Sequence, residues 1–348
     1  MAGPLRTLGG TGMAVSAVGF GAWAIGGPGW RFTWGQQDDG DSVAAIRRAV
    51  EQGVNWIDTA AVYGLGHSEE VVGRAIAGIP EADRPYVFTK CGLVWDPDNR
   101  SAAPRKIMSA VSVRREVEDS LRRLGVERLD LYQVHWPGDG RSLDWGGTGD
   151  DAPSPAAVPL EEYWQTMAEL RVEGKVRAIG LSNHDVAQLE IAETIAHVDA
   201  IQPPFSLLDR SAGDQLEWAA KNGTGAIVYQ PMYSGLLTGA FDRDRVAALP
   251  PDDWRRTAPA FTADLDRNLS VVDAMRPIAD RHDTSVSSVA IAWTLAWPGV
   301  TGAIVGARRP AQVDAWARAG SVELTQQDLV DLASAIRSAG VGKGPTHP

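Results

Sequence analysis

Four side chains that can take part in proton transfer stand where short apolar runs of the sequence end. Asp58, Lys90 and His135 each close such a run, and Tyr63 follows Asp58 by five residues. Each has a plain alternative explanation, because an Asp after a strand often forms a turn and a His on an apolar strand is often a hydrogen-bonded core residue. A carboxylate, an ammonium, a phenol and an imidazole at equivalent positions nevertheless indicate one shared site.

Carbonyl reduction is the chemistry that would use these four groups together. The carbonyl oxygen needs a proton as hydride reaches the carbon, and a Tyr phenol with its ordinary pKa of about 10 is a weak acid at neutral pH. A neighbouring ammonium stabilises phenolate, so we predict that Lys90 lowers the pKa of Tyr63 and that Asp58 keeps Lys90 in place and charged. His135 would orient the carbonyl and share the proton transfer. This chemistry requires no metal, and we predict none.

The elements that must position these side chains are eight short apolar runs that alternate with amphipathic stretches, a pattern typical of a parallel sheet built from βα units. The predicted strands lie within 17–23, 55–60, 86–92, 129–136, 176–183, 198–205, 225–231 and 300–307, and the predicted helices within 41–52, 68–77, 106–124, 160–173, 185–195, 214–222, 269–281 and 310–318. Eight strands favour a closed barrel over an open doubly wound sheet, which usually has about five or six. We therefore predict an α/β fold of the (β/α)8 TIM barrel type, in which the carboxyl ends of all strands meet at one rim.

Other segments complete this organisation. We expect a single domain over residues 1–348, with an N-terminal β-hairpin within 7–15 closing the barrel floor and extra C-terminal helices over 284–295 and 326–338. The segments 137–158 and 233–268 are too long for ordinary connections, so we interpret them as functional rim loops rather than as domain linkers. The tail 341–348 is expected to be short, flexible and a poor cover for the site.

Composition and charge exclude several classes of function. The formal net charge is −11, whereas a nucleic-acid surface needs Lys and Arg in excess. The sequence contains no run of about 18 apolar residues, the length needed to cross a membrane, and residues 1–10 lack the apolar segment of a signal peptide. A cytoplasmic location is therefore expected. Cys91 is the only Cys, which rules out an intramolecular disulfide and a thiolate metal cluster.

The chain has 13 Trp, and several stand at strand ends or in the loops that follow. Trp23 closes the first run, whose glycines at positions 19–27 lack the spacing of a dinucleotide fingerprint, and we predict that it lies near a nicotinamide. An aromatic-walled substrate pocket would use Trp30, Trp34, Trp95 and Trp136, with plain packing as the alternative for each.

Longer motifs around these residues resemble the aldo-keto reductase family. The segment NWIDTAAVYGLGHSEEVVGRAI, with FTKCG and QVHWP, places the family's Asp, Tyr, Lys and His on Asp58, Tyr63, Lys90 and His135. IGLSNH, IQPPFS, VYQPMYSGLLTG and AIVGARRPAQV continue the match in order along the chain. The bacterial NADPH-dependent short-form members are more similar than the potassium-channel β-subunit branch.

The resemblance implies a nicotinamide cofactor and residues that bind it. Tyr229 would stack on the nicotinamide ring, and the other implied contacts are Ser182, Asn183 and Gln202 for the carboxamide, Pro231, Ser234, Gly235 and Leu237 for the pyrophosphate, and Gly306, Arg308 and Gln312 for the adenosine end. The family often has an acidic residue and an Asn after the position of Asp314, where this chain has Ala315 and Trp316; Trp316 could instead stack on the adenine. Arg308 and Arg309 precede the last βα helix and favour the 2′-phosphate of NADPH, with NADH as the alternative.

The sequence therefore predicts reduction of an aldehyde or ketone to an alcohol, with a small-molecule carbonyl compound as substrate and with Tyr63 as the general acid. Two other functions stay open. One is a cofactor-binding regulatory subunit with little turnover, and the other is a sugar or polyol dehydrogenase that runs in the oxidative direction. The substrate's identity and the oligomeric state are not predicted, because specificity lies in loops that vary freely on this fold.

Overall fold

The computed structural model describes residues 3–143, 154–251 and 253–348. Within them, eight parallel strands form a closed barrel in the order β3-β4-β5-β8-β9-β10-β11-β12, and β12 pairs with β3. The strands are β3 (Val18–Gly21), β4 (Trp56–Asp58), β5 (Tyr86–Cys91), β8 (Leu129–Val134), β9 (Val176–Ser182), β10 (Ala200–Gln202), β11 (Gly225–Val228) and β12 (Gly302–Gly306). Each lies within one of the eight predicted runs, so the predicted (β/α)8 barrel is confirmed.

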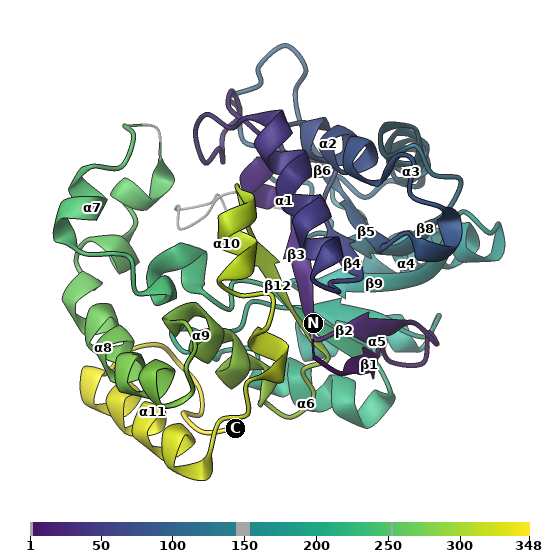
Figure 1. The fold of residues 1–348 in the computed structure, drawn as a ribbon. Helices are drawn as coiled ribbons and strands as arrows, with labels where there is room; N and C mark the ends of the chain where they lie inside the picture. The colour runs from purple at the N-terminus through teal and green to yellow at the C-terminus, as the bar shows by residue number, and fades with distance from the viewer. Residues whose placement is uncertain (1–2, 144–153, 252) are drawn as a thin grey trace.

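Helices surround the barrel, as Figure 1 shows. Those that follow the strands are α1 (Asp39–Glu51), α2 (His67–Ile76), α3 (Ala110–Leu124), α4 (Leu160–Val172), α5 (Val186–Glu193), α6 (Gly213–Asn222), α8 (Leu265–Arg281) and α10 (Pro310–Asp314). Outside this repeat lie α7 (Arg243–Ala247), α9 (Val286–Leu295) and α11 (Gln326–Ala339), and α8 packs against both α9 and α11. None of the described helices is long and apolar enough to cross a lipid bilayer.

Some predicted boundaries were wrong, and local contacts explain why. The helix expected from 106 begins at Ala110, because Arg105–Lys106 (β7) pairs with Leu93–Val94 (β6) and the Ser109 hydroxyl then accepts the Ser112 N–H. The helix expected from 269 begins at 265, and the last βα helix ends at 314 rather than 318.

The two predicted rim loops differ in how much of each the structure describes. Segment 233–268 is built mostly of short helices, namely α7 and three 3₁₀ turns at Tyr233–Thr238, Trp254–Arg256 and Pro259–Phe261, followed by the start of α8. Residues 144–153 of segment 137–158 lie outside the described residues.

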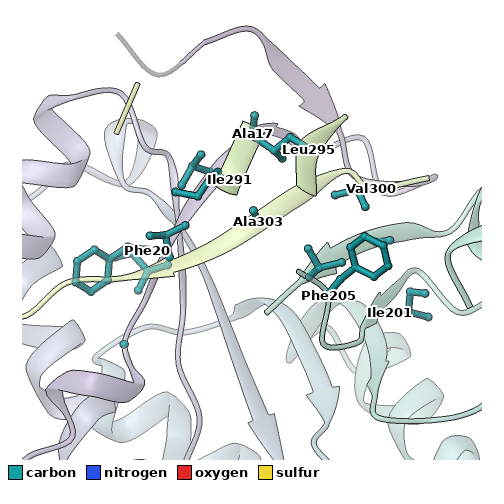
Figure 2. Packing of buried hydrophobic residues seen from close by; sticks show 14 of the residues in the cluster. Ala17, Phe20, Ile201, Phe205, Ile291, Leu295, Val300 and Ala303 are labelled. Atoms are coloured by element: carbon teal, nitrogen blue, oxygen red, sulfur yellow. The ribbon is translucent and has the colours of Figure 1, made fainter. Parts of the chain in front are cut away.

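The hydrophobic core has an outer layer between strands and helices and an inner one inside the barrel. Figure 2 shows Ile291 and Leu295 of α9 over Ala17 and Ala303, all buried. Burying such a side chain contributes roughly 1.5–3 kcal/mol, so this shell stabilises the barrel that holds the strand ends.

At the barrel floor, β1 (Leu5–Thr7) and β2 (Ala14–Ser16) form the predicted antiparallel hairpin. Leu8 and Met13 from its turn join the inner core around Trp56 and Phe88. Trp56 is fully buried, and its indole N–H donates to the Ser16 carbonyl at 2.8 Å. The floor is therefore closed by side chains, which leaves the opposite rim as the open end.

The C-terminal tail lies against the loop after β10. The buried Arg210 guanidinium donates to the carbonyls of Val341 and Pro345 at 3.0 and 2.9 Å, and the Arg210 N–H bonds to the Lys343 carbonyl. Backbone hydrogen bonds to a buried cation fix this segment at the side of the barrel.

Gly19 supplies the space for Trp56, and this predicts the effect of Gly19→Ala. A Cβ at residue 19 would lie 2.2 Å from Trp56 Cε2, so the substitution overpacks the barrel interior. We expect a loss of about 1–3 kcal/mol in the free energy of unfolding, measured by urea denaturation. Gly10→Ala is the matched control, because its nearest neighbour would be 3.9 Å away. Equal stability of the two variants would contradict this account of the barrel interior.

Candidate active site

A cavity of about 830 Å³ opens at the carboxyl ends of the barrel strands. Asp58, Tyr63 and His135 line one end of it, while Lys90 is fully buried behind Asp58. The structure thus brings the four predicted side chains together from three strands and one turn. Strands β4 and β5 are neighbours and β8 follows, so their ends meet at one part of the rim.

Lys90 and Asp58 form a buried ion pair. Lys90 Nζ lies 2.5 Å from Asp58 Oδ1 and 2.9 Å from the Thr59 carbonyl oxygen, and the two side chains are 0% and 4% exposed. Burial lowers the pKa of Lys90 below its ordinary 10.5, and the Asp58 carboxylate opposes this shift. The carboxylate therefore helps to keep the ammonium charged, as a buried cation requires.

The turn after β4 places Tyr63 over this pair. Gly64 has φ +63°, and a Cβ there would lie 1.9 Å from the Gly26 carbonyl oxygen, so only Gly fits the close approach of the two loops. The Tyr63 ring stacks on Trp23 with centroids 6.2 Å apart, and Lys90 Nζ lies 5.3 Å from the Tyr63 centroid.

The pKa of Tyr63 differs from the predicted direction. Burial raises it well above 10, and the carboxylate of Asp58 and the neighbouring Tyr229 add to the shift. The expected lowering by Lys90 does not prevail, because Asp58 already neutralises much of the ammonium's charge at short range. Tyr63 is consequently a fully protonated donor at neutral pH.

His135 meets Tyr63 edge to face, with ring centroids 5.7 Å apart and an interplanar angle of 79°. Burial, together with the charge of Lys90, lowers the pKa of His135 well below 6.5. The imidazole is therefore neutral at pH 7, and it can hold a carbonyl oxygen by a hydrogen bond rather than by a positive charge.

Polar groups continue along the cavity wall from this end. Asn183 Nδ2 donates to the His135 carbonyl at 2.9 Å, and the Tyr229 hydroxyl donates to Asn183 Oδ1 at 2.8 Å. The Ser182 hydroxyl donates to the Gln202 carbonyl at 2.8 Å. Ser182, Asn183, Gln202 and Tyr229 all line the cavity, so the structure brings together the side chains predicted to contact the carboxamide and the nicotinamide ring.

The segment after β11 forms the next part of the cavity wall. Pro231, Ser234 and Gly235 line it, and the left-handed backbone at Ser234 and Gly235, with φ of 54° and 94°, bends the chain along the wall. Leu237 does not line the cavity, because its side chain is buried in the core. Arg255 also lines the wall and was not predicted; it donates to the Ser234 carbonyl at 3.2 Å and lies over the Trp34 ring at 4.6 Å.

The far end of the cavity is rich in Arg. Gly306, Arg308, Arg309, Gln312 and Trp316 line it. Burial lowers the pKa of Arg308 below its ordinary value, and the charges of Arg255 and Arg309 lower it further. Crowded positive charge of this kind favours an anion.

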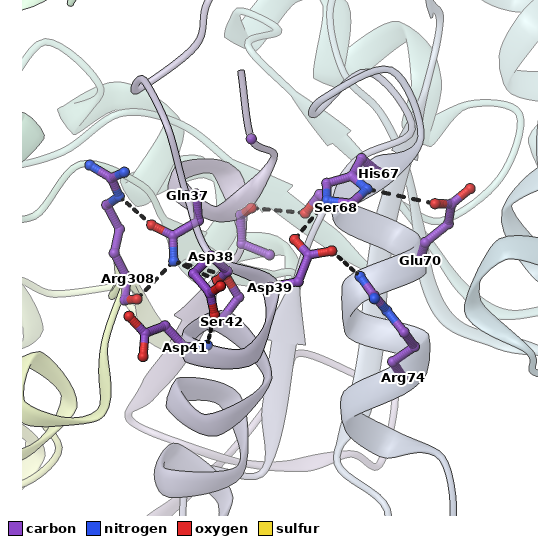
Figure 3. Close-up of polar contacts among 12 residues, drawn as sticks. Gln37, Asp38, Asp39, Asp41, Ser42, His67, Ser68, Glu70, Arg74 and Arg308 are labelled. Atoms are coloured by element: carbon purple, nitrogen blue, oxygen red, sulfur yellow. Dashed lines mark hydrogen bonds and ion pairs between the residues drawn. The ribbon is translucent and has the colours of Figure 1, made fainter. Parts of the chain in front are cut away.

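A neighbour of Arg308 was missed by sequence reasoning. Gln37 Oε1 accepts from Arg308 Nε at 2.6 Å, and Gln37 Nε2 donates to the Arg308 carbonyl at 2.9 Å (Figure 3). The backbone carbonyl of Gln36 accepts from the same guanidinium. Asp38 and Asp41, at the start of α1, line this end as well. No local pattern links these residues, because Gln37 and Arg308 are 271 positions apart.

Aromatic side chains surround the entrance near the tetrad. Trp23, Trp30, Trp34 and Trp136 line the cavity, together with Phe32, which the sequence reasoning overlooked. Trp95 does not line it and instead packs on the cluster around Trp30 and Leu93.

Comparison with known proteins agrees with this geometry. The sequence pattern of the aldo/keto reductase family matches residues 17–337. The chain is 35% identical over 327 residues to the aldo-keto reductase YhdN of Bacillus subtilis (strain 168), covering 92% of this chain and 90% of that one. It is 32% identical to the NADH-specific methylglyoxal reductase of Escherichia coli (strain K12), covering 92% and 94%. The glycerol dehydrogenase AKR11B4 from Gluconobacter oxydans superimposes with a TM-score of 0.83 at 35% identity over 97% of each chain.

The barrel with this cavity is thus an NAD(P)H-dependent oxidoreductase, as the sequence predicted. More particularly, the chain belongs to the aldo/keto reductase family, whose members reduce carbonyl compounds.

The charge states of the tetrad predict how turnover depends on pH. Because the pKa of His135 lies well below 6.5 and that of Tyr63 well above 10, neither group changes charge between these values. The lowered pKa of Lys90 means that its ammonium is lost as pH rises through a value below 10.5. We expect kcat for NAD(P)H oxidation to be constant upward from about pH 6.5 and then to fall on the alkaline side. A limb centred near pH 6.5, where an ordinary His titrates, would contradict these charge states.

Proposed function

We propose that this enzyme reduces an aldehyde or ketone to an alcohol with NADPH, and that Tyr63 donates the proton. The observation that carries the proposal is the meeting of the Tyr63 and His135 rings at the cavity wall, with the Lys90–Asp58 pair behind them. The four groups supply a proton donor, a neutral hydrogen-bonding imidazole and a buried charge pair at one point.

The residues of the cavity fit a nicotinamide dinucleotide. One end has amide and hydroxyl groups beside the Tyr229 ring, and the other has three Arg side chains. We propose that Tyr229 stacks on the nicotinamide near Trp23, that Ser182, Asn183 and Gln202 hold its carboxamide, and that Pro231, Ser234 and Gly235 border the pyrophosphate, with Leu237 supporting that segment from the core. Gly306, Arg308 and Gln312 would hold the adenosine end. When bound, the reduced cofactor supplies a hydride to the carbonyl carbon.

The chain's own residues act on the carbonyl oxygen. His135 holds that oxygen by a hydrogen bond, which its neutral imidazole can make in the buried site. The Tyr63 hydroxyl gives its proton to the same oxygen as the C=O double bond becomes a single bond, and the phenol regains a proton from solvent after the alcohol leaves. The ammonium of Lys90, 5.3 Å from the Tyr63 ring centroid, stabilises the phenolate that forms in between. Trp30, Trp34, Phe32 and Trp136 border the space left for the substrate.

NADPH is preferred to NADH in this proposal because of the charge around Arg308. The like charges of Arg255 and Arg309 act on Arg308, and a 2′-phosphate would relieve their repulsion. Asp38 and Asp41 at the same end would oppose a phosphate, and one relative is named an NADH-specific methylglyoxal reductase. The balance between these charges decides the cofactor, so it is open to direct test.

Tyr63→Phe tests the proton donor. The substitution keeps the ring that stacks on Trp23 and removes only the hydroxyl, so we expect kcat with an aldehyde panel to fall by roughly 10² or more. NADPH binding, measured by fluorescence titration, should persist. Tyr86→Phe is the matched control, because Tyr86 begins β5 at the other end of the barrel. Near wild-type turnover of Tyr63→Phe would reject Tyr63 as the acid.

Arg308→Ala tests the choice of cofactor. A charge-assisted hydrogen bond contributes about 1.5–3 kcal/mol, so the Kd for NADPH should rise about ten- to hundredfold and that for NADH should change little. Arg276→Ala, on the exposed face of α8, is the control. Equal losses for both cofactors would show that Arg308 serves only to hold Gln36 and Gln37 in place, and a wild-type preference for NADH would reject the proposal.

A further inference from the structure

One layer of the barrel interior is polar. Following the strand register around the barrel, Asp58 of β4, Gln133 of β8, Gln202 of β10 and Ile304 of β12 occupy equivalent inward positions on alternate strands. Such layers are usually filled by Val, Ile and Leu. Here three of the four side chains are polar, and Asp58, Gln133 and Gln202 are 3%, 0% and 2% exposed. Buried polar groups of this kind are costly unless they bond one another.

The three polar side chains do bond one another. Gln202 Nε2 donates to Asp58 Oδ2 at 2.9 Å and to Gln133 Oε1 at 3.2 Å, and Gln133 Nε2 lies 3.5 Å from the same Asp58 oxygen. Lys90 occupies the other oxygen, Oδ1. Both oxygens of the carboxylate therefore have hydrogen-bond donors within the protein, as a buried polar group requires.

A glycine makes room for this arrangement. Strand β9 lies between β8 and β10, and its Gly180 pairs in register with both Gln133 and Ala200. A Cβ at Gly180 would lie 3.1 Å from Gln133 Cγ and 2.7 Å from the Ala200 carbonyl oxygen. Because β9 presents no side chain at this level, the two amides can meet across it.

Gln133 and Asp58 together decide how the Gln202 amide is turned. The Gln133 oxygen and the Asp58 carboxylate both require the nitrogen of Gln202, so that nitrogen faces inward and Gln202 Oε1 is turned away from both as an acceptor. Gln202 lines the cavity, whereas Gln133 does not. The orientation of a cavity-lining acceptor is thus fixed in part by a residue that does not itself line the cavity.

We propose that Gln133 is a positioning residue for the reaction: together with Gln202 it holds the Asp58 carboxylate against Lys90, and through Gln202 it links the nicotinamide carboxamide to that ion pair. Its effect on turnover rests on the function proposed above, while its effect on Asp58 does not. A residue that only fills space would be replaceable by an apolar side chain of similar length. A positioning role for Gln133 means instead that such a replacement should lower turnover.

Two substitutions and a control separate these roles. Gln133→Met keeps the length and removes both hydrogen-bonding groups, so we expect kcat to fall about tenfold or more, with the Kd for NADPH changed much less.

Gln133→Glu keeps the shape of the side chain. Its protonated form can still donate to Asp58, but its ionised form repels that carboxylate. We expect its kcat to be highest at acid pH and to fall as pH rises, well before the alkaline limb of the wild type. Leu131→Met, two residues earlier on the inward face of β8, controls for packing and should match the wild type.

Thermal melting from about pH 5 to 9 gives a readout that needs no turnover. The charged groups around position 133 are Asp58 and Lys90, with Glu69 acting on Lys90. The nearby titratable groups are Tyr63, His135 and Tyr229, together with Cys91, whose Sγ lies 3.5 Å from the Gln133 carbonyl oxygen. The carboxyl group that Gln133→Glu introduces would be buried beside Asp58 and should have a raised pKa in the folded state, so its stabilising protonated form is lost as pH rises. The Tm difference between Gln133→Glu and wild type should therefore widen with pH, whereas that of Gln133→Met should stay constant.

The outcomes are distinguishable. A wild type that reduces no carbonyl in a broad panel rejects the proposed function, and the melting series still decides whether Gln133 supports Asp58. A Gln133→Met enzyme with wild-type kcat, or a Gln133→Glu enzyme whose kcat and Tm follow the wild type at every pH, overturns the inference. If Gln133→Met fails to fold, the pH dependence of Gln133→Glu carries the test. Equal losses of kcat and NADPH affinity with no pH dependence would show that Gln133 only fills the core.

Discussion

The buried ion pair between Lys90 and Asp58 is the interaction on which the rest of the site depends. Two charges removed from water cost several kcal/mol each, and their attraction offsets this only when the remaining hydrogen-bonding positions are also filled. Here Lys90 bonds to Asp58 and the Thr59 carbonyl, and the second carboxylate oxygen is held by side-chain amides. The pair fixes the height at which Tyr63 and His135 meet, because Tyr63 lies over Lys90 and His135 lies against Tyr63.

The barrel brings residues from distant parts of the sequence to the Lys90–Asp58 pair. Alternate strands contribute side chains to one layer, so residues 75 and 144 positions away from Asp58 arrive at its carboxylate without any local contact. Absence of side chains matters as much as their presence: Gly180 lets two amides meet, and Gly64 lets the turn that carries Tyr63 approach Gly26. The apolar shell outside the strands and the Trp56 layer below them keep these positions fixed, which is what a site built on strand ends requires.

The sequence predicted the strands and the tetrad because both leave a local trace, namely an apolar run followed by a polar residue. The sequence did not predict contacts between residues that are far apart in the chain but close in the folded structure. The bonds of Gln37 to Arg308 join opposite ends of the chain, and Trp95 stands at a strand end yet packs outside the cavity. The pKa of Tyr63 was predicted in the wrong direction, because the sequence suggests a neighbouring ammonium but not how fully Asp58 neutralises it or how deeply the phenol is buried. Gln133 belongs to the motif QVHWP, and nothing in that motif indicates that the strand register of the barrel places it beside Asp58.

The two ends of the cavity differ in charge, and this difference gives the site a direction. At the tetrad end, a neutralised ion pair, a protonated phenol and an uncharged imidazole leave no net charge at pH 7. At the other end, three Arg side chains (Arg255, Arg308 and Arg309) lie with three Asp (Asp38, Asp41 and Asp253), so the formal charges balance, but at Arg308 the repulsion from Arg255 and Arg309 outweighs the attraction of Asp253. In the function proposed above, the phosphates of an anionic dinucleotide would lie beside Arg308, because positive charge attracts phosphate across several ångströms in a cleft with low-dielectric walls. The nicotinamide ring, which is uncharged in the reduced cofactor, would then lie at the neutral end beside Tyr63 and His135.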